Sequence, residues 1–326
     1  MTDVKESIFL RNGELNYKKQ IIYLGLLFSD TGSISYDIHL NVSNRRSNVS
    51  VKFSNFCARN YLAPLKIKLA VLHSCVMSSL CYGIEVWGDN STKEHEKVYK
   101  MGLKTALSVR FSTCDEIVYT ETGTHPIKCI FKKRQIKFWS SLLSSMNVNS
   151  PLFNLIQKAR DINLPYITYY ENLISKYKSA EICYKELKLE CIHSMTQKIR
   201  NAFVNDPNSK LGTYLQVNPD LTTPKYSDSM YEIERIHVTR FRTGSHNLAI
   251  ETGRFNSPPL ARELRLCKCG NSIQTVHHVF FECDIINRME NFDTFANEFT
   301  LVSEFFSWPR LHEYLLCISR ALKFEL

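Results

Sequence analysis

Residues 179–204 read SAEICYKELKLECIHSMTQKIRNAFV, and this stretch indicates the fold class most clearly. Its apolar residues recur at intervals of three and four, as at Ile192, Met195 and Ile199. An α-helix has 3.6 residues per turn, so side chains at that spacing share one face. We therefore predict a long helix over 179–204. Its predicted inward-facing side chains are Ile182, Cys191, Ile192, Met195, Ile199 and Phe203.

The same periodicity extends toward the N-terminus. It predicts further helices over residues 37–60, 64–83, 91–109, 114–122 and 126–146. Pro64 suits the opening of the second of these, because the first turn of a helix does not use its amide hydrogens. Ser91-Thr92-Lys93-Glu94 has the pattern of a capping box, which favours a helix start at that point.

Two other stretches lack this helical pattern. The β-prone pieces Phe9-Leu10 and Ile21–Gly25 lie on either side of the turn sequence Asn12-Gly13, which predicts a short hairpin. Residues 205–228 contain three prolines among Asn, Asp, Ser and Thr, which favours a linker or a long loop. A final module is expected to begin near Tyr231. The fold class predicted from all of this is mainly α.

The charge of the chain is moderately basic and unevenly spread. Of its 326 residues, 41 are Lys or Arg and 32 are Asp or Glu, giving a formal charge of +9. No acidic residue occurs in Ile38–Ile84 or in His125–Trp139, although these hold six and five basic residues. Such stretches favour a polyanionic partner, because each neutralised phosphate releases a counterion. The alternative is a pair of solvated helix faces beside acidic neighbours.

The cysteines and the apolar stretches bear on the compartment. Eleven Cys in a chain whose first ten residues carry Asp3 and Glu6 argue for a reducing environment rather than secretion. The most apolar stretch, Leu69–Tyr82, is too short to span a bilayer. We expect an intracellular protein, cytoplasmic or nuclear, without a membrane partner.

Four residues near the C-terminus have the spacing of a metal site. Cys267, Cys269, His278 and Cys283 form the pattern C-x-C-x8-H-x4-C. Two closely spaced ligand pairs joined by a loop can surround zinc as a tetrahedron, and Gly270 would let the backbone turn beneath it. This predicts one structural zinc ion. His277 stays an alternative to His278, and a chance grouping of buried cysteines is the alternative to a metal site.

Several motifs occur in an order that resembles a known family. They are Ile22-Tyr23-Leu24-Gly25 with Thr31-Gly32-Ser33, Leu80-Cys81-Tyr82-Gly83-Ile84-Glu85-Val86-Trp87-Gly88, Val118-Tyr119 with Glu121, Gly123 and Pro126, and Phe241-Arg242-Thr243-Gly244-Ser245-His246 before the Cys/His pattern. This order resembles the C-terminal part of non-LTR (LINE-type) retrotransposon reverse transcriptases: the end of the palm, the thumb, a linker and a zinc knuckle. Residues 140–230 contribute little to the resemblance.

The resemblance implies four regions. They are a remnant of palm-end β structure (1–35), a helical thumb-like domain (36–148), a helical region with a linker (149–229) and a C-terminal helical module with the knuckle (230–326). The implied partner is RNA or an RNA–DNA duplex, gripped by its backbone. Its predicted phosphate contacts are Arg45, Arg46, Arg59, Lys66, Lys68, Lys132, Lys133 and Arg134.

The chain also departs from the family. RNA-directed DNA polymerases hold two metal ions with an Asp-Asp pair, and this sequence contains none. We therefore expect no catalytic residues, no small-molecule substrate and no polymerase activity from this chain alone. The main expectation is a nucleic-acid-binding part of a reverse transcriptase-like protein, without a nuclease domain. The alternatives are a truncated part of an active polymerase and a zinc-stabilised protein-interaction module.

Overall fold

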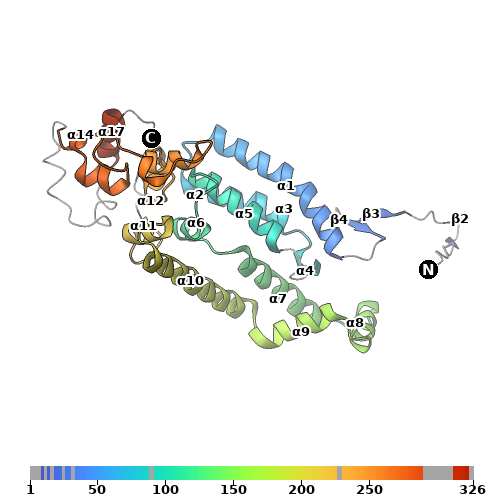
Figure 1. Cartoon of the computed structure of the whole chain (residues 1–326). Coiled ribbons are helices and arrows are strands. Elements are labelled where there is room, and N and C mark those ends of the chain that lie inside the picture. Colours follow the sequence, from blue (N-terminus) through green and yellow to red (C-terminus); the bar gives the residue numbers. More distant parts are fainter. Residues whose placement is uncertain are drawn as a thin grey trace.

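A computed structural model describes residues 9–10, 13–14, 18–23, 26–30, 34–87, 92–225, 230–288 and 311–322. The fold is mainly helical, as predicted (Figure 1). The N-terminal end holds two short antiparallel strand pairs. Strand β1 (Phe9–Leu10) pairs with β2 (Gly13–Glu14), and β3 (Gln20–Tyr23) pairs with β4 (Leu26–Ser29). A short hairpin is thus present near the N-terminus, as predicted, but the two predicted β-prone pieces belong to different strand pairs: Phe9–Leu10 pairs with Gly13–Glu14, and Gln20–Tyr23 pairs with Leu26–Ser29.

The first group of helices encloses a core formed by residues from 53 to 131. Its elements are α1 (Ile34–Arg59), α2 (Leu65–Val71), the π-helical turn η1 (Leu72–Met77), α3 (Ser78–Leu80), α4 (Ile84–Trp87), α5 (Thr92–Leu107) and α6 (Asp115–Thr122). Leu72, Leu103 and Val118 are fully buried in this core. Pro64 precedes α2, as predicted. Ser91, in the predicted capping box, lies outside the described residues.

The second group consists of α7 (Ile127–Ser145), α8 (Pro151–Asp161), α9 (Pro165–Tyr177) and α10 (Ala180–Asn205). The long helix predicted over 179–204 is confirmed, but its buried face differs from the prediction. Ile182 and Ile192 are 43% and 37% exposed, whereas Cys183 and Leu187 are buried. Helix α10 packs against both α7 and α9, and the side of α10 that they cover carries Cys183 and Leu187 instead of these two isoleucines.

The expected linker over 205–228 contains a helix, which corrects that prediction. Helix α11 (Lys210–Val217) is capped by the Ser209 hydroxyl, which accepts a hydrogen bond from the Gly212 amide at 3.0 Å. All three prolines of the stretch lie outside the helix, so they bound it without breaking it. Buried Tyr214 fixes α11 to α6 by donating to a Glu121 carboxylate oxygen at 2.8 Å.

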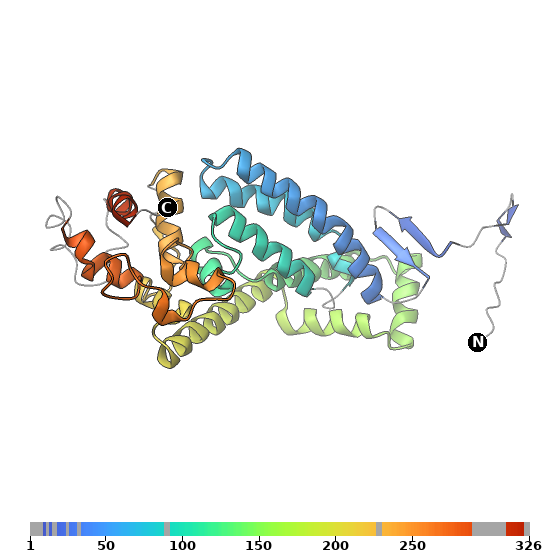
Figure 2. The same cartoon turned by 45° about the horizontal axis from the view of Figure 1, so that its top comes forward.

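A third core lies in the C-terminal part of the chain. It is built from α12 (Glu232–Arg242), α13 (Ala249–Thr252), the helical turns η4 (Gly253–Phe255), η5 (Arg262–Leu264) and η6 (His278–Glu282), α14 (Asp284–Asn287) and α17 (Leu311–Leu322). Figure 2 shows this part at one end of the molecule, opposite the N-terminal strands. Its core combines the buried Cys267 and Cys283 with Leu315 and Ile318 of α17.

Helix α12 joins this third core to the first through buried charges. Lys68 of α2 lies 2.7 Å from a carboxylate oxygen of Glu232, and Arg235 donates to both oxygens of that carboxylate, at 2.7 and 2.9 Å. At the other end of α12, Arg242 donates two hydrogen bonds to Glu121 of α6, at 3.0 and 3.1 Å. The C-terminal part is therefore packed directly on the helical bundle.

None of the described helices has both the length and the apolar character needed to cross a membrane.

Candidate metal centre and the basic pocket beside it

The four residues predicted as metal ligands come together. One ligand atom from each of Cys267, Cys269, His278 and Cys283 lies within 4.8 Å of all the others. The Sγ atoms of Cys267 and Cys283 are 3.7 Å apart, and Cys269 Sγ is 3.2 Å from His278 Nε2. For a metal–sulfur distance of about 2.3 Å, a tetrahedral site has sulfur atoms about 3.8 Å apart. This cluster could therefore hold a metal ion.

The backbone of residues 265–275 explains how two cysteines reach one point. Leu266 and Ile273 form an antiparallel bridge, and the Cys267 amide donates to Ser272 O at 2.8 Å. At the tip of this small loop Gly270 has φ +80°, a conformation that suits glycine. The tight turn brings the Cys267 and Cys269 side chains to the same side.

The other two ligands come from the turn that follows. The Thr275 hydroxyl accepts a hydrogen bond from the His278 amide at 3.0 Å, which starts η6. This geometry buries His278 at 4% exposed, whereas the His277 side chain is 61% exposed and lies 3.1 Å from Glu282. The structure therefore groups His278, and not His277, with the cysteines. Glu282 also lies 3.5 Å from His278 Nδ1, where a carboxylate can orient a ligating imidazole.

The thiols of the loop differ in acidity. Burial raises the pKa of Cys267 to about 12. Burial also acts on Cys269, but backbone hydrogen bonds at Asn271 and the contact with Cys267 outweigh it, so the pKa of Cys269 is lowered. A cation among these sulfur atoms would favour the thiolate form of each, because an opposite charge stabilises the ionised group.

The predicted phosphate contacts differ in their exposure to solvent. Lys68 is 1% exposed and is held by Glu232 and by the carbonyl of Tyr61, at 2.7 Å each, so it is not available to a phosphate. That prediction was wrong. A stretch of sequence without acidic residues can still fold against a distant acidic residue, and here Glu232, 164 residues away, pairs with Lys68. Arg59 and Lys66 are exposed, as a phosphate contact requires. Arg45 and Arg46 belong to α1, but their side chains lie outside the described residues.

The basic cluster on α7 has partners within the protein. Lys133 pairs with Glu181 of α10 at 2.8 Å, and Arg134 pairs with Glu85 at 2.9 Å. Lys132 places its Nζ 4.4 Å from the centre of the Tyr169 ring. Helix α5 lies between α1 and α7 and contacts both (Figure 1). Helices α1 and α7, which carry basic residues of the two acid-free stretches, are thus separated by α5, and the basic cluster on α7 is partly neutralised.

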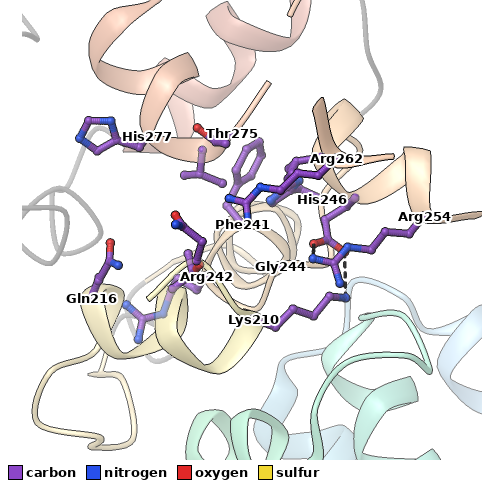
Figure 3. A pocket seen from close by; sticks show the side chains of 15 residues that line it. Lys210, Gln216, Phe241, Arg242, Gly244, His246, Arg254, Arg262, Thr275 and His277 are labelled. Carbon is purple, nitrogen blue, oxygen red and sulfur yellow. Dashed lines mark ion pairs between the residues drawn. The ribbon is translucent and has the colours of Figure 1, made fainter. Parts of the chain in front are cut away.

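A basic pocket that sequence reasoning missed adjoins the metal cluster (Figure 3). It has a volume of about 110 Å³ and is lined by α11, α12, α13, η4, η5 and residues 275–277. Figure 3 shows the side chains of Lys210, Arg254 and Arg262 approaching it from three separate segments. Since Lys210 lies 44 residues before Arg254, no local pattern could reveal the pocket.

The charges in this pocket are incompletely balanced. Lys210 and Arg254 share one buried carboxylate, that of Glu251, at 2.8 and 3.3 Å. Arg242 is paired with Glu121, as described above. Within the described part of the chain, Arg262 has neither an ion pair nor a hydrogen-bond partner for its side chain. Four cations therefore face two carboxylates, which leaves an excess of positive charge.

Buried His246 lines the same pocket in its neutral form. Burial lowers its pKa to about 3, and nearby Arg110 and Lys210 act in the same direction. Its Nδ1 accepts a hydrogen bond from the Leu248 amide at 3.3 Å, and its ring stacks on Phe241. The motif 241–246 is therefore a packed support for the pocket wall.

Comparison of the chain with models of known families, with curated proteins and with solved structures finds no match. What the protein does must therefore be argued from its own residues.

Proposed function

We propose that this chain is the nucleic-acid-binding C-terminal part of a retrotransposon reverse transcriptase-like protein, with one structural zinc ion in its C-terminal module. The cluster of three cysteines and one histidine carries the proposal. This donor set is typical of structural zinc sites, in which four protein ligands close the tetrahedron. The zinc would be held by Cys267, Cys269, His278 and Cys283.

Burial around the cluster supports a structural role for the metal. Cys267 and Cys283 are 3% and 0% exposed and form part of the core that α17 covers. The Tyr314 hydroxyl of α17 donates to Phe280 O, between the last two ligands, at 3.1 Å. Zinc binding would therefore fix the loop on which the third core is built, and its binding free energy would contribute to folding.

The nucleic-acid part of the proposal rests on charge and on the resemblance. The net charge of +9, the exposed Arg59 and Lys66 and the basic pocket beside the cluster all favour a polyanion. The order of motifs resembles the thumb, linker and knuckle of LINE-type reverse transcriptases. RNA or an RNA–DNA duplex is the partner that fits both.

The zinc site can be tested with two neighbouring histidines. His278→Ala should lose zinc, because it removes a ligand, whereas His277→Ala should retain one zinc per chain. Elemental analysis of the purified proteins measures both. A wild-type protein without zinc, whose unfolding a chelator leaves unchanged, would refute the metal site.

Nucleic-acid binding can be tested by fluorescence anisotropy. The wild-type chain should bind single-stranded RNA and an RNA–DNA duplex at low salt, with an affinity that falls as salt rises. Binding should tolerate changes of sequence, because phosphate contacts carry no sequence information. No binding to either probe at low salt would refute this function and favour the protein-interaction alternative.

A further inference from the structure

We propose that the basic pocket and an aromatic ledge next to it form a binding site for single-stranded nucleic acid, in which the pocket takes a backbone phosphate and Phe255 stacks on a base. The inference rests on the proposed function and assigns it to a surface. None of its residues belongs to the phosphate contacts predicted from the sequence.

The phosphate would sit among Lys210, Arg254 and Arg262. Because Lys210 and Arg254 share the single carboxylate of Glu251, neither cation is fully neutralised. Arg262 is half-buried, lines the pocket and has no partner among the described residues, so its guanidinium donors are available to an anion. A guanidinium matches the geometry of a phosphate because it can donate two parallel hydrogen bonds.

The aromatic ledge consists of Phe111 and Phe255, and Phe255 belongs to the same turn, η4, as Arg254. A shallow hollow of about 500 Å³ is lined by Arg110, Phe111, Ser112, Thr252 and Phe255. Phe111 and Phe255 are 63% and 56% exposed, an unusual state for phenylalanine. The Arg110 guanidinium lies 5.1 Å from the centre of the Phe255 ring, which it covers on one face. The remaining exposed surface of that ring could stack on a base.

Two further contacts hold the ledge in place. Arg110 donates to Asn247 Oδ1 and, through its backbone amide, to Ser245 Oγ, at 2.6 Å each. Its Nη1 is buried and has no hydrogen-bond partner among the described residues. The two hydrogen bonds therefore fix the Arg110 guanidinium over one face of the Phe255 ring and leave the rest of that ring to a base.

The two hollows share one helical turn, η4. Arg254 lines the pocket and the next residue, Phe255, lines the ledge, so one strand could place a phosphate in the first and an unpaired base on the second. The site requires an unpaired base, because the bases of a duplex are already stacked on their neighbours. We therefore expect it to prefer a single strand.

Two variants give different signatures in a titration against fluorescent oligouridylate. Phe255→Ala should weaken binding about fivefold or more, because it removes a stacking surface, and should leave the salt dependence unchanged. Arg262→Gln should weaken binding and should lower the slope of log affinity against log salt by about 0.7, the value for one phosphate contact on a single strand. Both side chains are partly exposed, so neither change should unfold the protein.

The matched controls lie on α8. Leu155→Ala changes a side chain that is 63% exposed, and Arg160→Gln removes a charge at the opposite end of the molecule. Both should bind as the wild type does. If the wild type binds RNA but Phe255→Ala and Arg262→Gln behave like these controls, or if duplex RNA binds as tightly as the single strand, the site is wrong while the proposed function stands. If the wild type binds no nucleic acid, both fail.

Discussion

Lys66 and Lys68 test the assignment of phosphate contacts, because substitution of these two lysines of α2 should affect the stability of the protein to different extents. Lys66 is exposed on α2, whereas Lys68 is buried and donates to Glu232 and to Tyr61 O, at 2.7 Å each. Lys66→Met should leave stability within about 0.5 kcal/mol of the wild type, as surface substitutions usually do. Lys68→Met should destabilise the protein without changing the salt dependence of RNA binding.

The magnitudes follow from the partners that remain. After Lys68→Met, Glu232 keeps both hydrogen bonds from Arg235, so the loss is that of a hydrogen bond to a charged group, about 1.5–3 kcal/mol. Glu232→Gln is more severe, because it leaves two buried cations facing a neutral amide. Removing one partner of a buried ion pair costs about 3–5 kcal/mol.

Urea unfolding followed by circular dichroism measures these differences. With an m value of about 3 kcal/mol/M, Glu232→Gln should lower the midpoint by about 1 M or more, and Lys68→Met by less. The reasoning is refuted if Lys68→Met unfolds like the wild type and yet reduces the salt slope of RNA binding. That result would restore Lys68 to the phosphate contacts predicted from the sequence.

Three other predictions concern the metal, the chemistry and the pH dependence. Cys269→Ser should release zinc and open the C-terminal module to proteolysis, whereas Cys75→Ser, which changes an exposed thiol, should do neither. The purified chain should not extend a primed template, because it has no Asp-Asp pair to hold two metal ions; metal-dependent extension abolished by a substitution in this chain would contradict this. Since burial lowers the pKa of His246 to about 3, its unfolded form binds a proton below about pH 6.5 that the folded form does not. Stability should then fall by up to about 1.4 kcal/mol per pH unit between about pH 6.5 and 3, and urea unfolding of His246→Gln should show a shallower fall.

Features that depend on residues close together in the sequence could be predicted. Helices appear where apolar residues recur with the helical period, and α7 and α10 begin and end within one residue of the predicted bounds. The metal cluster was equally predictable, because its ligands lie within 17 consecutive residues and a single tight turn at Gly270 brings them together. The choice between His277 and His278 needed the structure, since adjacent residues of a turn point in different directions.

What the sequence could not predict depends on distant partners. Helix α11 was missed because the prolines on both sides of it resembled those of a linker, while its anchor, the hydroxyl of Tyr214 on Glu121, joins residues 93 apart. The burial of Lys68 was missed for the same reason. Its acidic partner lies on α12, too far along the chain for a local count of charges to reveal the pair.

Helix α12 links these distant ion pairs to the surface proposed to bind nucleic acid. Its first turn is held on α2 by Glu232, and its last turn on α6 by Arg242, both through buried ion pairs. The chain leaves α12 through Ser245 and Asn247, which bind Arg110 and so fix one side of the aromatic ledge. The next turns supply Arg254 and Phe255. The ion pairs at both ends of α12 oppose its rotation, and so help to keep Ser245 and Asn247 on Arg110. The buried charges that α12 makes with the bundle thus position the residues proposed to bind nucleic acid.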